Sequence, residues 1–360
     1  MPSLKASDQR LAAVHKSMRS SPNGRRESRM SREHQTTELL VLAGADVERL
    51  LTMAQCIGLM ERTMRVVSSG GAQLPLRIGA AIPGGNVLAA MPGYLEQPAS
   101  AGAKIIAVYP ENARRGLSSH LGVVVLFDPA RGVPVAILDA TSITALRTAA
   151  ASAVATNALA RSDAGELAIL GAGEQAATHL TAMAHVRKLR SVCIWARRPE
   201  KAQAFAREHA GSVDVPIRIA TTVEEAVRDA DLVCTTTGAR EPILEGAWIR
   251  AGTHVNLVGA SSAQTREANE ALVMKAAYFC DFRPSALAQA GELIAAAGAL
   301  AERHIRGEIG EVLNGKVRGR SNADEVTIYK SLGIAAQDLA AAHHVYVEAQ
   351  REGCGTRVRL

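Results

Sequence analysis

The fold of this chain is decided by the stretch Glu166-Leu167-Ala168-Ile169-Leu170-Gly171-Ala172-Gly173-Glu174-Gln175-Ala176. A short apolar run leads into Gly-Ala-Gly, and an alanine-rich helical pattern follows. This order predicts a buried parallel strand, a tight turn and the start of a helix. Gly171 permits the turn, Gly173 lets a pyrophosphate approach the backbone, and Ala176 lets helix and strand pack closely. The anion would lie on free N–H groups at the positive helix end, which is typical of a dinucleotide site.

Alternation of strands and helices continues after this stretch. We expect strands near residues 166–170, 191–195, 216–220, 231–236, 254–259 and 277–281, with helices between them. Residues 285–312 are expected to be helical. Such alternation predicts a Rossmann-type, doubly wound parallel sheet.

The first part of the chain has a different pattern. We expect a strand over residues 38–42, a helix from 45 to about 67 with Asp46 as a possible cap, an antiparallel meander over 74–91, and strands over 104–109, 122–127 and 134–139. A helix is expected from residue 141 to 159. Residues 324–332 are expected to form a strand or to lead into a helix, and residues 333–352 a long amphipathic helix that packs back onto the first part.

These patterns predict an α/β fold with two domains. The dinucleotide-binding Rossmann domain is expected over residues 146–324. The first part, with the C-terminal helix packed back onto it, is expected to form a mostly antiparallel α+β domain over residues 37–145 and 325–360. The length of 360 residues suits two domains of ordinary size. Because 48% of the residues are hydrophobic and only 3% aromatic, we expect a core of Ala, Val, Leu and Ile.

Basic residues are concentrated at the N-terminus. Residues 1–36 contain eight Lys or Arg and three Asp or Glu, whereas the remainder contains 33 basic and 32 acidic residues. The net charge of +6 therefore comes from this basic tail, and the rest of the chain gives no argument for a nucleic-acid surface. The polar tail is predicted to be disordered. Alternatively, Met30 is the true start; a transit peptide fits less well because acids are present.

The sequence also limits the environment of the protein. No apolar run is long enough to span a bilayer, and the tail lacks the apolar region of a signal peptide. The five cysteines are scattered without a Cys-x-x-Cys pair, so we expect reduced thiols in a cytoplasmic protein. We predict no metal site, no nucleic-acid partner and no membrane partner.

The second strand of the predicted dinucleotide domain bears on the choice of cofactor. In NAD-binding folds an acid at the end of this strand binds the ribose 2′-hydroxyl. Here Arg197 and Arg198 follow the strand, and no acid stands there. Two guanidiniums suit a 2′-phosphate, so NADP(H) is favoured and NAD(H) is possible. The alternative interpretation is that both arginines belong to a solvated turn.

Three cations stand beside apolar runs instead of within charged faces. They are Arg77, Lys104 and Arg147, and Arg147 lies at the junction with the predicted dinucleotide domain. A group of cations in an apolar cleft indicates recognition of a carboxylate. Considered singly, each of them is as easily explained as a surface cation.

The motifs that carry a family resemblance are Pro75-x-Arg77, Met91-Pro92, Lys104, Pro110-x-Asn112, Leu146-Arg147-Thr148-Ala149-Ala150, Gly171-Ala172-Gly173-x-Gln175-Ala176 and Arg266-Glu267. In order and spacing the chain resembles the ornithine cyclodeaminase/mu-crystallin family over about residues 38–350. The resemblance implies an NAD(P)-dependent fold, a substrate and dimerisation domain closed by the C-terminal helix, and a homodimer. Family members include ornithine cyclodeaminases, alanine dehydrogenases, ketimine reductases and reductases of cyclic imino acids. The equivalents of Arg77, Lys104 and Arg147 hold the substrate carboxylate beside the nicotinamide.

The candidate residues fall into two groups. On the substrate side we predict Arg77, Met91, Lys104, Arg147 and Ser261. On the cofactor side we predict Thr148, Gly171, Gly173, Glu174, Gln175, Ala176, Arg197, Arg198, Thr236, Thr237 and Gly259. The threonines after the fourth strand of the dinucleotide domain are alternatively only a β-branched strand end.

Two departures from the family pattern bear on the reaction. Cyclodeaminases carry an aspartate six residues before the position of Glu267, and Ser261 stands there in this chain. They also place an acid just before the Met-Pro pair, where this chain has Ala89-Ala90. Ornithine is a diamine whose amino groups need carboxylate partners and a base. The serine therefore resembles the imine reductase branch of the family.

The first hypothesis is an NAD(P)H-dependent reductase of the C=N bond of a small cyclic α-imino acid, of the ketimine or pyrroline-2-carboxylate type, that yields the L-amino acid. Arg77 and Arg147 would clamp the carboxylate. Lys104 would protonate the nitrogen, with Ser261 or water as the alternative relay. His120 is a further candidate acid or a structural residue. The other hypotheses are an ornithine cyclodeaminase with tightly held NAD, an alanine-type dehydrogenase, and a non-catalytic NADPH-dependent binding protein.

Overall fold

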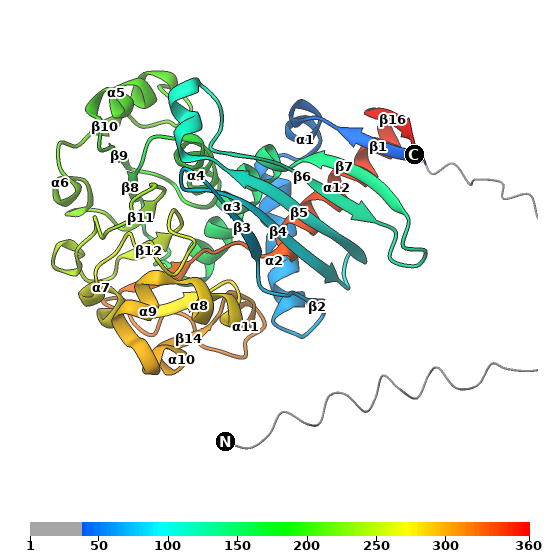
Figure 1. Cartoon of the computed structure of the whole chain (residues 1–360). Coiled ribbons are helices and arrows are strands. Elements are labelled where there is room, and N and C mark those ends of the chain that lie inside the picture. The colour runs from blue at the N-terminus through cyan, green and yellow to red at the C-terminus, as the bar shows by residue number, and fades with distance from the viewer. Residues whose placement is uncertain (1–37) are drawn as a thin grey trace, which may run out of the picture. The chain divides into compact units, whose positions relative to one another are not determined.

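The computed structural model describes residues 38–360, without the side chains at positions 113 and 114. The predicted basic tail, residues 1–36, lies outside the described residues. Two sheets, here called sheet A and sheet B, lie side by side in the described part of the chain (Figure 1). Sheet B carries the predicted dinucleotide motif, and sheet A holds most of the first part of the chain.

Sheet B is entirely parallel, with the strand order β10-β9-β8-β11-β12-β15-β13-β14. Its strands are β8 (Glu166–Leu170), β9 (Ser191–Trp195), β10 (Ile217–Ile219), β11 (Leu232–Thr235), β12 (His254–Leu257), β13 (Ala277–Cys280), β14 (Ile305–Glu308) and β15 (Thr327–Lys330). The order reverses between β8 and β11, which is the topological switch point where such sheets bind ligands. The Rossmann-type parallel sheet is confirmed.

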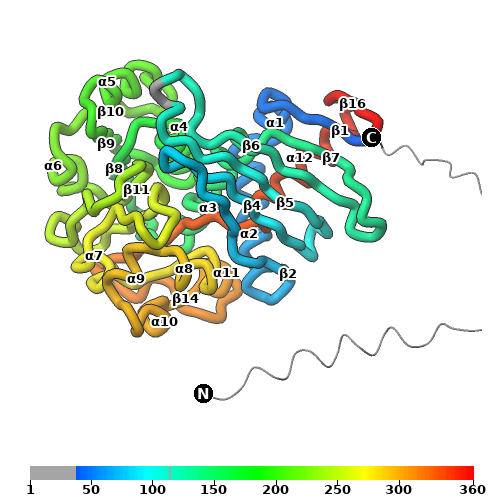
Figure 2. The backbone as a smooth tube through the Cα atoms, viewed as in Figure 1, coloured from blue at the N-terminus to red at the C-terminus, as the bar shows by residue number. Residues whose placement is uncertain are grey.

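Sheet A is mixed and mostly antiparallel, in the order β16-β1-β7-β6-β5-β4-β2, with β3 paired to β4. Its strands are β1 (Glu38–Leu42), β2 (Ala72–Gln73), β3 (Ile78–Ile82), β4 (Asn86–Leu95), β5 (Ser100–Val108), β6 (His120–Phe127), β7 (Pro134–Asp139) and β16 (Thr356–Arg359). Only β1 and β7 pair in parallel. Strand β16 pairs with β1, so both ends of the described chain lie at one edge of the sheet (Figure 2).

The helix α3 (Ala140–Leu159) joins the two sheets. It contacts β5 and β6 of sheet A and β12 and β15 of sheet B. Fifteen of its 20 residues are buried, and most of these are Ala, Ser and Thr. Because these side chains are short, neighbouring elements can approach the helix closely from all sides, as a helix buried all round requires.

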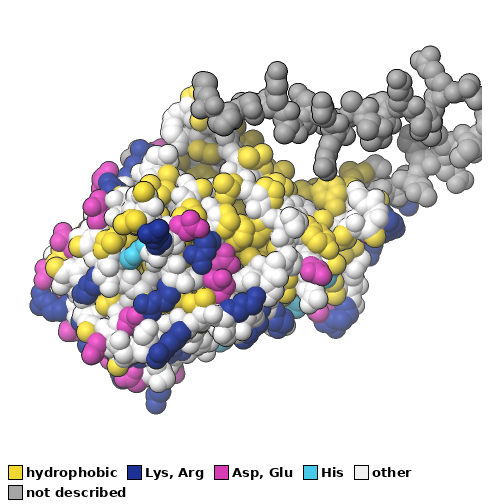
Figure 3. All heavy atoms as spheres, turned by 90° about the horizontal axis from the view of Figure 1, so that it is seen from below, with side chains coloured by type: hydrophobic (Ala, Val, Ile, Leu, Met, Phe, Trp, Pro, Cys, Tyr) yellow, Lys and Arg dark blue, Asp and Glu magenta, His cyan; other side chains and the backbone are white. Residues whose placement is uncertain are grey.

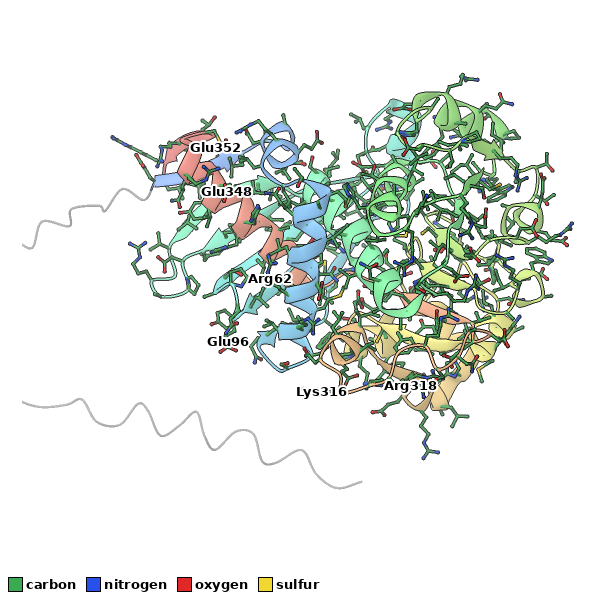
Figure 4. All side chains as sticks on the ribbon, turned by 180° about the vertical axis from the view of Figure 1, so that it is seen from behind. Arg62, Glu96, Lys316, Arg318, Glu348 and Glu352 are labelled. Atoms are coloured by element: carbon green, nitrogen blue, oxygen red, sulfur yellow. The ribbon has the colours of Figure 1, made fainter. Side chains whose placement is uncertain are left out.

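Two further helices cover the back of sheet A. They are α2 (Met53–Val67) and α12 (Ala335–Glu352), and α12 contacts β4, β5 and β6. Figure 4 shows the two helices from behind, with Arg62 on α2 and Glu348 on α12. The predicted C-terminal helix is therefore present and packs on the first part of the chain, as expected.

The remaining helical elements are α1 (Gly44–Leu50), η1 (Pro110–Arg115), α4 (Glu174–Val186), α5 (Pro199–Glu208), α6 (Val223–Val227), η2 (Gly246–Trp248), α7 (Glu270–Lys275), α8 (Arg283–Gln289), α9 (Gly291–Ala297), η3 (Gly298–Leu300), α10 (Ala301–His304) and α11 (Ile309–Leu313). No helix in the described range 38–360 is long and apolar enough to cross a membrane.

The single helix predicted from residue 45 to 67 was wrong, because the structure has α1 and α2 instead. The break falls before Thr52, whose hydroxyl accepts from the Gln55 backbone while the Gln55 side chain accepts from the Thr52 N–H. This capping box starts a new helix. Asp46 lies in the first turn of α1 and accepts from the Ala43 N–H at 3.0 Å, so it is not the residue that precedes the helix.

Three other segments also differ from the prediction. Residues 74–77 are not a strand. They connect β2 to β3. The helical segment predicted over 285–312 is interrupted by β14. The strand expected as one option for residues 324–332 is present as β15, but it lies inside sheet B, so the chain returns to sheet A only with α12 and β16. A domain boundary after Lys330 therefore fits the sheets better than one at residue 325.

Candidate active site

A cavity of about 360 Å³ lies at the carboxyl ends of the sheet B strands, against the inner face of sheet A. Sheet A contributes Ala89, Met91, Lys104, Ile106, Val108 and His120. Sheet B contributes the loops that follow β8, β11, β12 and β15. The cavity therefore lies at the edge where parallel α/β sheets place their ligands.

The glycine turn after β8 has the geometry that a dinucleotide needs. Gly171 has a φ of 114°, and a Cβ atom there would lie 2.6 Å from the Thr236 carbonyl oxygen. Gly173 precedes α4 without any side-chain cap, and nothing lies within 4 Å of the position that its Cβ would take. The first turn of α4 is thus open to an anion. Ala176 is fully buried against the sheet.

The two arginines predicted to choose the cofactor follow β9 directly and are exposed. Arg198 lies 3.9 Å from Glu200, and no ion pair involves Arg197 in the described chain. Neither residue lines the cavity. The Gly171 N–H donates to the Trp195 carbonyl at the end of β9. The strand that precedes the two arginines is therefore hydrogen-bonded to the glycine turn.

The loops after β11 and β12 are held by Glu267, which is fully buried. Its Oε1 accepts from the Thr237 N–H at 2.8 Å and the Thr237 hydroxyl at 2.7 Å. Its Oε2 accepts from the Thr235 hydroxyl and the Gly259 N–H, both at 2.7 Å, and from the Ala260 N–H at 3.2 Å. Five hydrogen bonds to one carboxylate fix both loops at the cavity.

The predicted cofactor residues Thr236 and Gly259 have structural reasons for their identity. The Thr236 hydroxyl donates to the Leu170 carbonyl at 3.1 Å. A Cβ on Gly259 would lie 2.0 Å from the Thr237 carbonyl oxygen, so only glycine fits there. Both residues line the cavity together with Thr237. The hydroxyls of Thr236 and Thr237 therefore have a structural role in the loops, whether or not these residues also contact a cofactor.

The structure brings the three predicted cations Arg77, Lys104 and Arg147 together around one carboxylate. Asp338 Oδ1 accepts from Lys104 Nζ at 2.9 Å and from Arg147 Nε at 2.9 Å. Arg77 Nη2 donates to the Leu332 carbonyl at 2.9 Å. All three cations line the cavity. Lys104 and Arg147 are only 3% and 4% exposed, so these charges face the cavity and not bulk solvent.

Burial and charge together set the protonation of this cluster. Burial and the Arg147 guanidinium lower the pKa of Lys104 to about 7, although Asp338 opposes the shift. Burial raises the pKa of Asp338, but Arg147 and Lys104 outweigh burial and leave that pKa below its ordinary value. The ammonium of Lys104 is therefore able to lose and regain a proton near neutral pH.

Asp338 and Asp281 are site residues that the sequence analysis missed. Asp281 Oδ2 accepts from the N–H groups of Leu332 at 2.8 Å and Gly333 at 2.7 Å, and it thereby holds the loop that Arg77 contacts. Burial raises the pKa of Asp281. A signal for Asp338 was present, because an acid stands among apolar residues at the start of the predicted C-terminal helix. No comparable signal marked Asp281.

Gly333 lets the Arg147 guanidinium lie against the backbone. Its φ is 76°, and a Cβ atom there would lie 2.6 Å from Arg147 Nη1. The same Nη1 donates to the Gln337 side-chain carbonyl at 3.0 Å. The guanidinium is thus fixed on one side by α12 and on the other by the loop after β15, which preorganises it for an anion.

The other predicted site residues also lie at the cavity. Met91, Ser261 and Gln175 line it, and so does Thr148, whose hydroxyl is buried without a hydrogen-bond partner in the described structure. His120 Nδ1 lies 2.8 Å from the Ser119 hydroxyl. Burial, followed by the nearby Lys104 charge, lowers the pKa of His120, so its imidazole is neutral near pH 7 and poorly suited to donate a proton.

The fold and the site together define a dinucleotide-binding α/β protein whose cavity is lined by Arg77, Lys104 and Arg147. The model of the ornithine cyclodeaminase/mu-crystallin family matches residues 37–353. The chain belongs to this family.

Known relatives resemble the chain in sequence and in fold. The chain is 37% identical to ketimine reductase mu-crystallin of Mus musculus over 259 residues, which cover 72% of this chain and 79% of the mouse protein. The solved structure of Thermococcus litoralis Δ1-pyrroline-2-carboxylate reductase in complex with NADH and L-proline is 36% identical, with a TM-score of 0.86, and the match covers 89% of this chain and 100% of that one. An archaeal alanine dehydrogenase dimer with bound NAD is 31% identical, with a TM-score of 0.84, over 89% and 99% of the two chains. The chain is an NAD(P)-dependent oxidoreductase of this family.

Proposed function

We propose that this enzyme reduces the C=N bond of a small cyclic α-imino acid, of the ketimine or pyrroline-2-carboxylate type, to the L-amino acid. The observation that carries the proposal is the cluster of Arg77, Lys104 and Arg147, which lies in the same cavity as the glycine turn and in which Lys104 and Arg147 are buried. When bound, the reduced nicotinamide would supply the hydride for the imine carbon. The nitrogen gains a proton, so the products are the amino acid and the oxidised cofactor.

The protein's own groups orient the substrate and move the proton. The guanidiniums of Arg77 and Arg147 would bind the carboxylate and hold the imine carbon in one position, which is a positioning contribution to the rate. Lys104 would donate the proton to the nitrogen, because its pKa of about 7 allows it to exchange a proton at neutral pH. Ser261 lines the same cavity and is the alternative relay.

The lining of the cavity favours an imine over a diamine. Besides Lys104 and His120, sheet A lines the cavity with the apolar residues Ala89, Met91, Ile106 and Val108. The one acid among the cavity-lining residues is Glu174, which begins the helix after the glycine turn. A second amino group of ornithine would therefore lack a carboxylate partner beside the apolar residues of sheet A. This supports reduction over cyclodeamination.

We propose NADP(H) as the preferred cofactor, with NAD(H) possible. Arg197 and Arg198 are exposed, they follow the strand whose end is bound to the glycine turn, and no acid stands at the end of that strand to bind a 2′-hydroxyl. They therefore suit a 2′-phosphate. The Thermococcus litoralis relative binds NADH, so both cofactors belong in the assay.

We also propose a homodimer formed through the outer face of sheet A. The register places Ile78, Ala90, Ile105 and Val123 on one row and Leu88, Ala107 and Leu121 on the next. Lys104 and Ile106 point to the opposite, cavity face because side chains alternate. Ile78 is 65% exposed, and Leu88, Ile105 and Leu121 are 39–45% exposed. Figure 3, a view from below, shows hydrophobic side chains gathered in the middle of that face and charged ones toward its edges.

The dimer is tested by light scattering of the full chain. Ile105→Glu, which places a charge on the outer face, is expected to yield monomers. Met274→Glu is the matched control, because Met274 is 51% exposed and lies on helix α7, outside sheet A. A monomeric wild type, or a dimer that survives Ile105→Glu, would argue against this interface.

The reaction is tested by following NADPH absorbance with a panel of cyclic imino acids. We expect one equivalent of NADPH to be consumed for each imine reduced. In parallel, ornithine with catalytic NAD is assayed for ammonia, and L-alanine with NAD is assayed for NADH. Ammonia and proline formed from ornithine, without net change in cofactor and without imine reduction, would contradict the proposal.

A further inference from the structure

One carboxylate oxygen of Asp338 holds two cations of the site at the same time. Lys104 Nζ and Arg147 Nε each lie 2.9 Å from Oδ1. The three residues come from β5, α3 and α12, so no local segment of the chain could arrange them alone. Asp338 does not line the cavity, whereas both cations do. The carboxylate therefore lies behind the two charges that would meet the substrate.

The surroundings of Asp338 make its charge effective. The side chain is fully buried, and its second oxygen, Oδ2, has no hydrogen-bond partner in the described structure. The interaction with Lys104 is therefore barely screened by water. Lys104 has one further partner, the Thr144 hydroxyl at 3.3 Å, which is neutral. Asp338 is thus the ion-pair partner of Lys104 in the described chain.

We propose that Asp338 is a positioning residue of the reductase: it holds Lys104 and Arg147 in fixed relative places and supplies the negative charge that keeps Lys104 protonated until the imine nitrogen takes the proton. This rests on the reductase function proposed above. Asp338 acts through Lys104 and Arg147, and it touches neither the substrate nor the cofactor.

The proposal follows from the charges that surround the Lys104 ammonium. The charged and titratable groups that interact with it are Arg147 on α3, Asp338 on α12, Arg77 before β3 and His120 on β6. Cys56 on α2 and Asp281 after β13 interact with Arg147. The Cys56 thiol is neutral, because burial raises its pKa to about 12. Burial and two guanidiniums favour loss of the Lys104 proton. Of the two nearby aspartates, only Asp338 bonds the ammonium directly.

The same arrangement explains how the proton is released at the correct step. With Lys104 protonated, the five groups Arg77, Lys104, Arg147, Asp281 and Asp338 carry one net positive charge, which one substrate carboxylate neutralises. As hydride adds to the imine carbon, the π electron pair of the C=N bond moves to nitrogen and takes a proton from Lys104. Lys104 is left neutral beside Asp338, and it regains a proton from water when the product leaves.

The direct test titrates Lys104 without any ligand. The chain has eight lysines, so lysine labelled with ¹³C at Cε gives few NMR signals, and Lys104→Arg identifies the signal of Lys104. We expect its midpoint at about pH 7 in the wild type. Asp338→Asn keeps an acceptor oxygen and removes the charge, so the midpoint is expected to fall by about 1 to 3 pH units. A midpoint that stays within about 0.3 units of the wild-type value would overturn the proposal.

Three further variants make the test specific. Arg147→Gln removes a like charge, so the Lys104 midpoint is expected to rise. Thr144→Val removes only a neutral acceptor and is expected to change the midpoint much less than Asp338→Asn. Asp281→Asn removes a buried carboxylate that does not bond Lys104, and it controls for general loss of structure. If Asp338→Asn does not fold, a wild-type midpoint well below about pH 6 still overturns the proposal, because Lys104 would then be neutral at neutral pH in spite of Asp338.

The kinetic test separates this inference from the function on which it rests. In the wild type, kcat/KM for imine reduction is expected to fall as pH rises through the Lys104 midpoint. In Asp338→Asn that fall is expected at a pH about 1 to 3 units lower, and kcat is expected to decrease more than KM increases. Absence of imine reduction by the wild type at every pH contradicts the proposed function alone, and the NMR titration still decides the role of Asp338. Imine reduction with an unshifted pH profile in Asp338→Asn contradicts the inference alone.

Discussion

Replacement of Glu267 by glutamine is expected to destabilise the protein far more than its conservative chemistry suggests. The buried carboxylate accepts five hydrogen bonds from the loops after β11 and β12. A glutamine retains one carbonyl oxygen. In the more favourable orientation of the amide group, this oxygen takes the place of Oε2, which accepts from three donors in the wild type. The NH₂ group of the glutamine then faces the Thr237 N–H, which is a donor and cannot accept.

The magnitude follows from these contacts. The Thr237 hydroxyl is able to rotate and accept from the new NH₂ group, but the Thr237 N–H is left buried without an acceptor, at a cost of about 1–3 kcal/mol. The three remaining hydrogen bonds become weaker because their acceptor is no longer charged. This loss is partly offset because burying a neutral amide costs less free energy than burying a carboxylate. The free energy of unfolding is therefore expected to fall by about 2–4 kcal/mol.

Urea denaturation of wild type, Glu267→Gln and Glu270→Gln measures this difference. Glu270 is a matched control three residues along the chain, because its side chain is 64% exposed and lies 3.9 Å from Arg266. Its substitution is expected to change the free energy of unfolding by less than about 0.5 kcal/mol. A Glu267→Gln protein as stable as the control would refute the reasoning. Since both loops line the cavity, we also expect a higher KM for the cofactor.

Two further predictions concern buried histidines and the cofactor. Burial lowers the pKa of His179 to about 4 and that of His254 to about 3, against about 6.5 in the unfolded chain. The stability that each neutral imidazole contributes is present above pH 6.5 and is lost as pH falls toward 4. At pH 5 the free energy of unfolding is expected to be lower by about 2 kcal/mol for each histidine. Equal free energies of unfolding at pH 7 and pH 5 would be inconsistent with this. Replacement of Arg197 and Arg198 by serine is expected to raise KM for NADPH by about tenfold or more and to leave KM for NADH unchanged; equal effects on both cofactors would count against a 2′-phosphate site.

The part of the fold that could be predicted from the sequence is the part specified by local pattern. The β8–turn–α4 unit was predicted because an apolar run, two glycines and a helical pattern follow one another within 11 residues. Strand β14 was missed because its four residues, Ile305–Glu308, include arginine, glycine and glutamate and stand between helical segments. The break before Thr52 had a local signal, the Thr-x-x-Gln capping box, which was overlooked.

The site was predictable only where a residue's type and neighbours indicated its role. Arg77, Lys104 and Arg147 were identified as cations beside apolar runs, and the structure gathers them at one cavity. Asp338 was missed because its partner Lys104 lies 234 residues away in the sequence. Asp281 was missed because it acts on backbone N–H groups, which have no residue type that a sequence could reveal.

The most direct measurement compares two imines that differ only in the carboxylate. With NADPH, kcat/KM is determined for Δ1-piperideine-2-carboxylate and for Δ1-piperideine, with wild type, Arg147→Met and the exposed control Arg218→Met. We predict that wild type and Arg218→Met prefer the carboxylate by about 10³-fold or more, and that Arg147→Met loses most of this preference. Comparable rates with both imines, or a preference that survives Arg147→Met, would contradict a cationic site built for an imino acid.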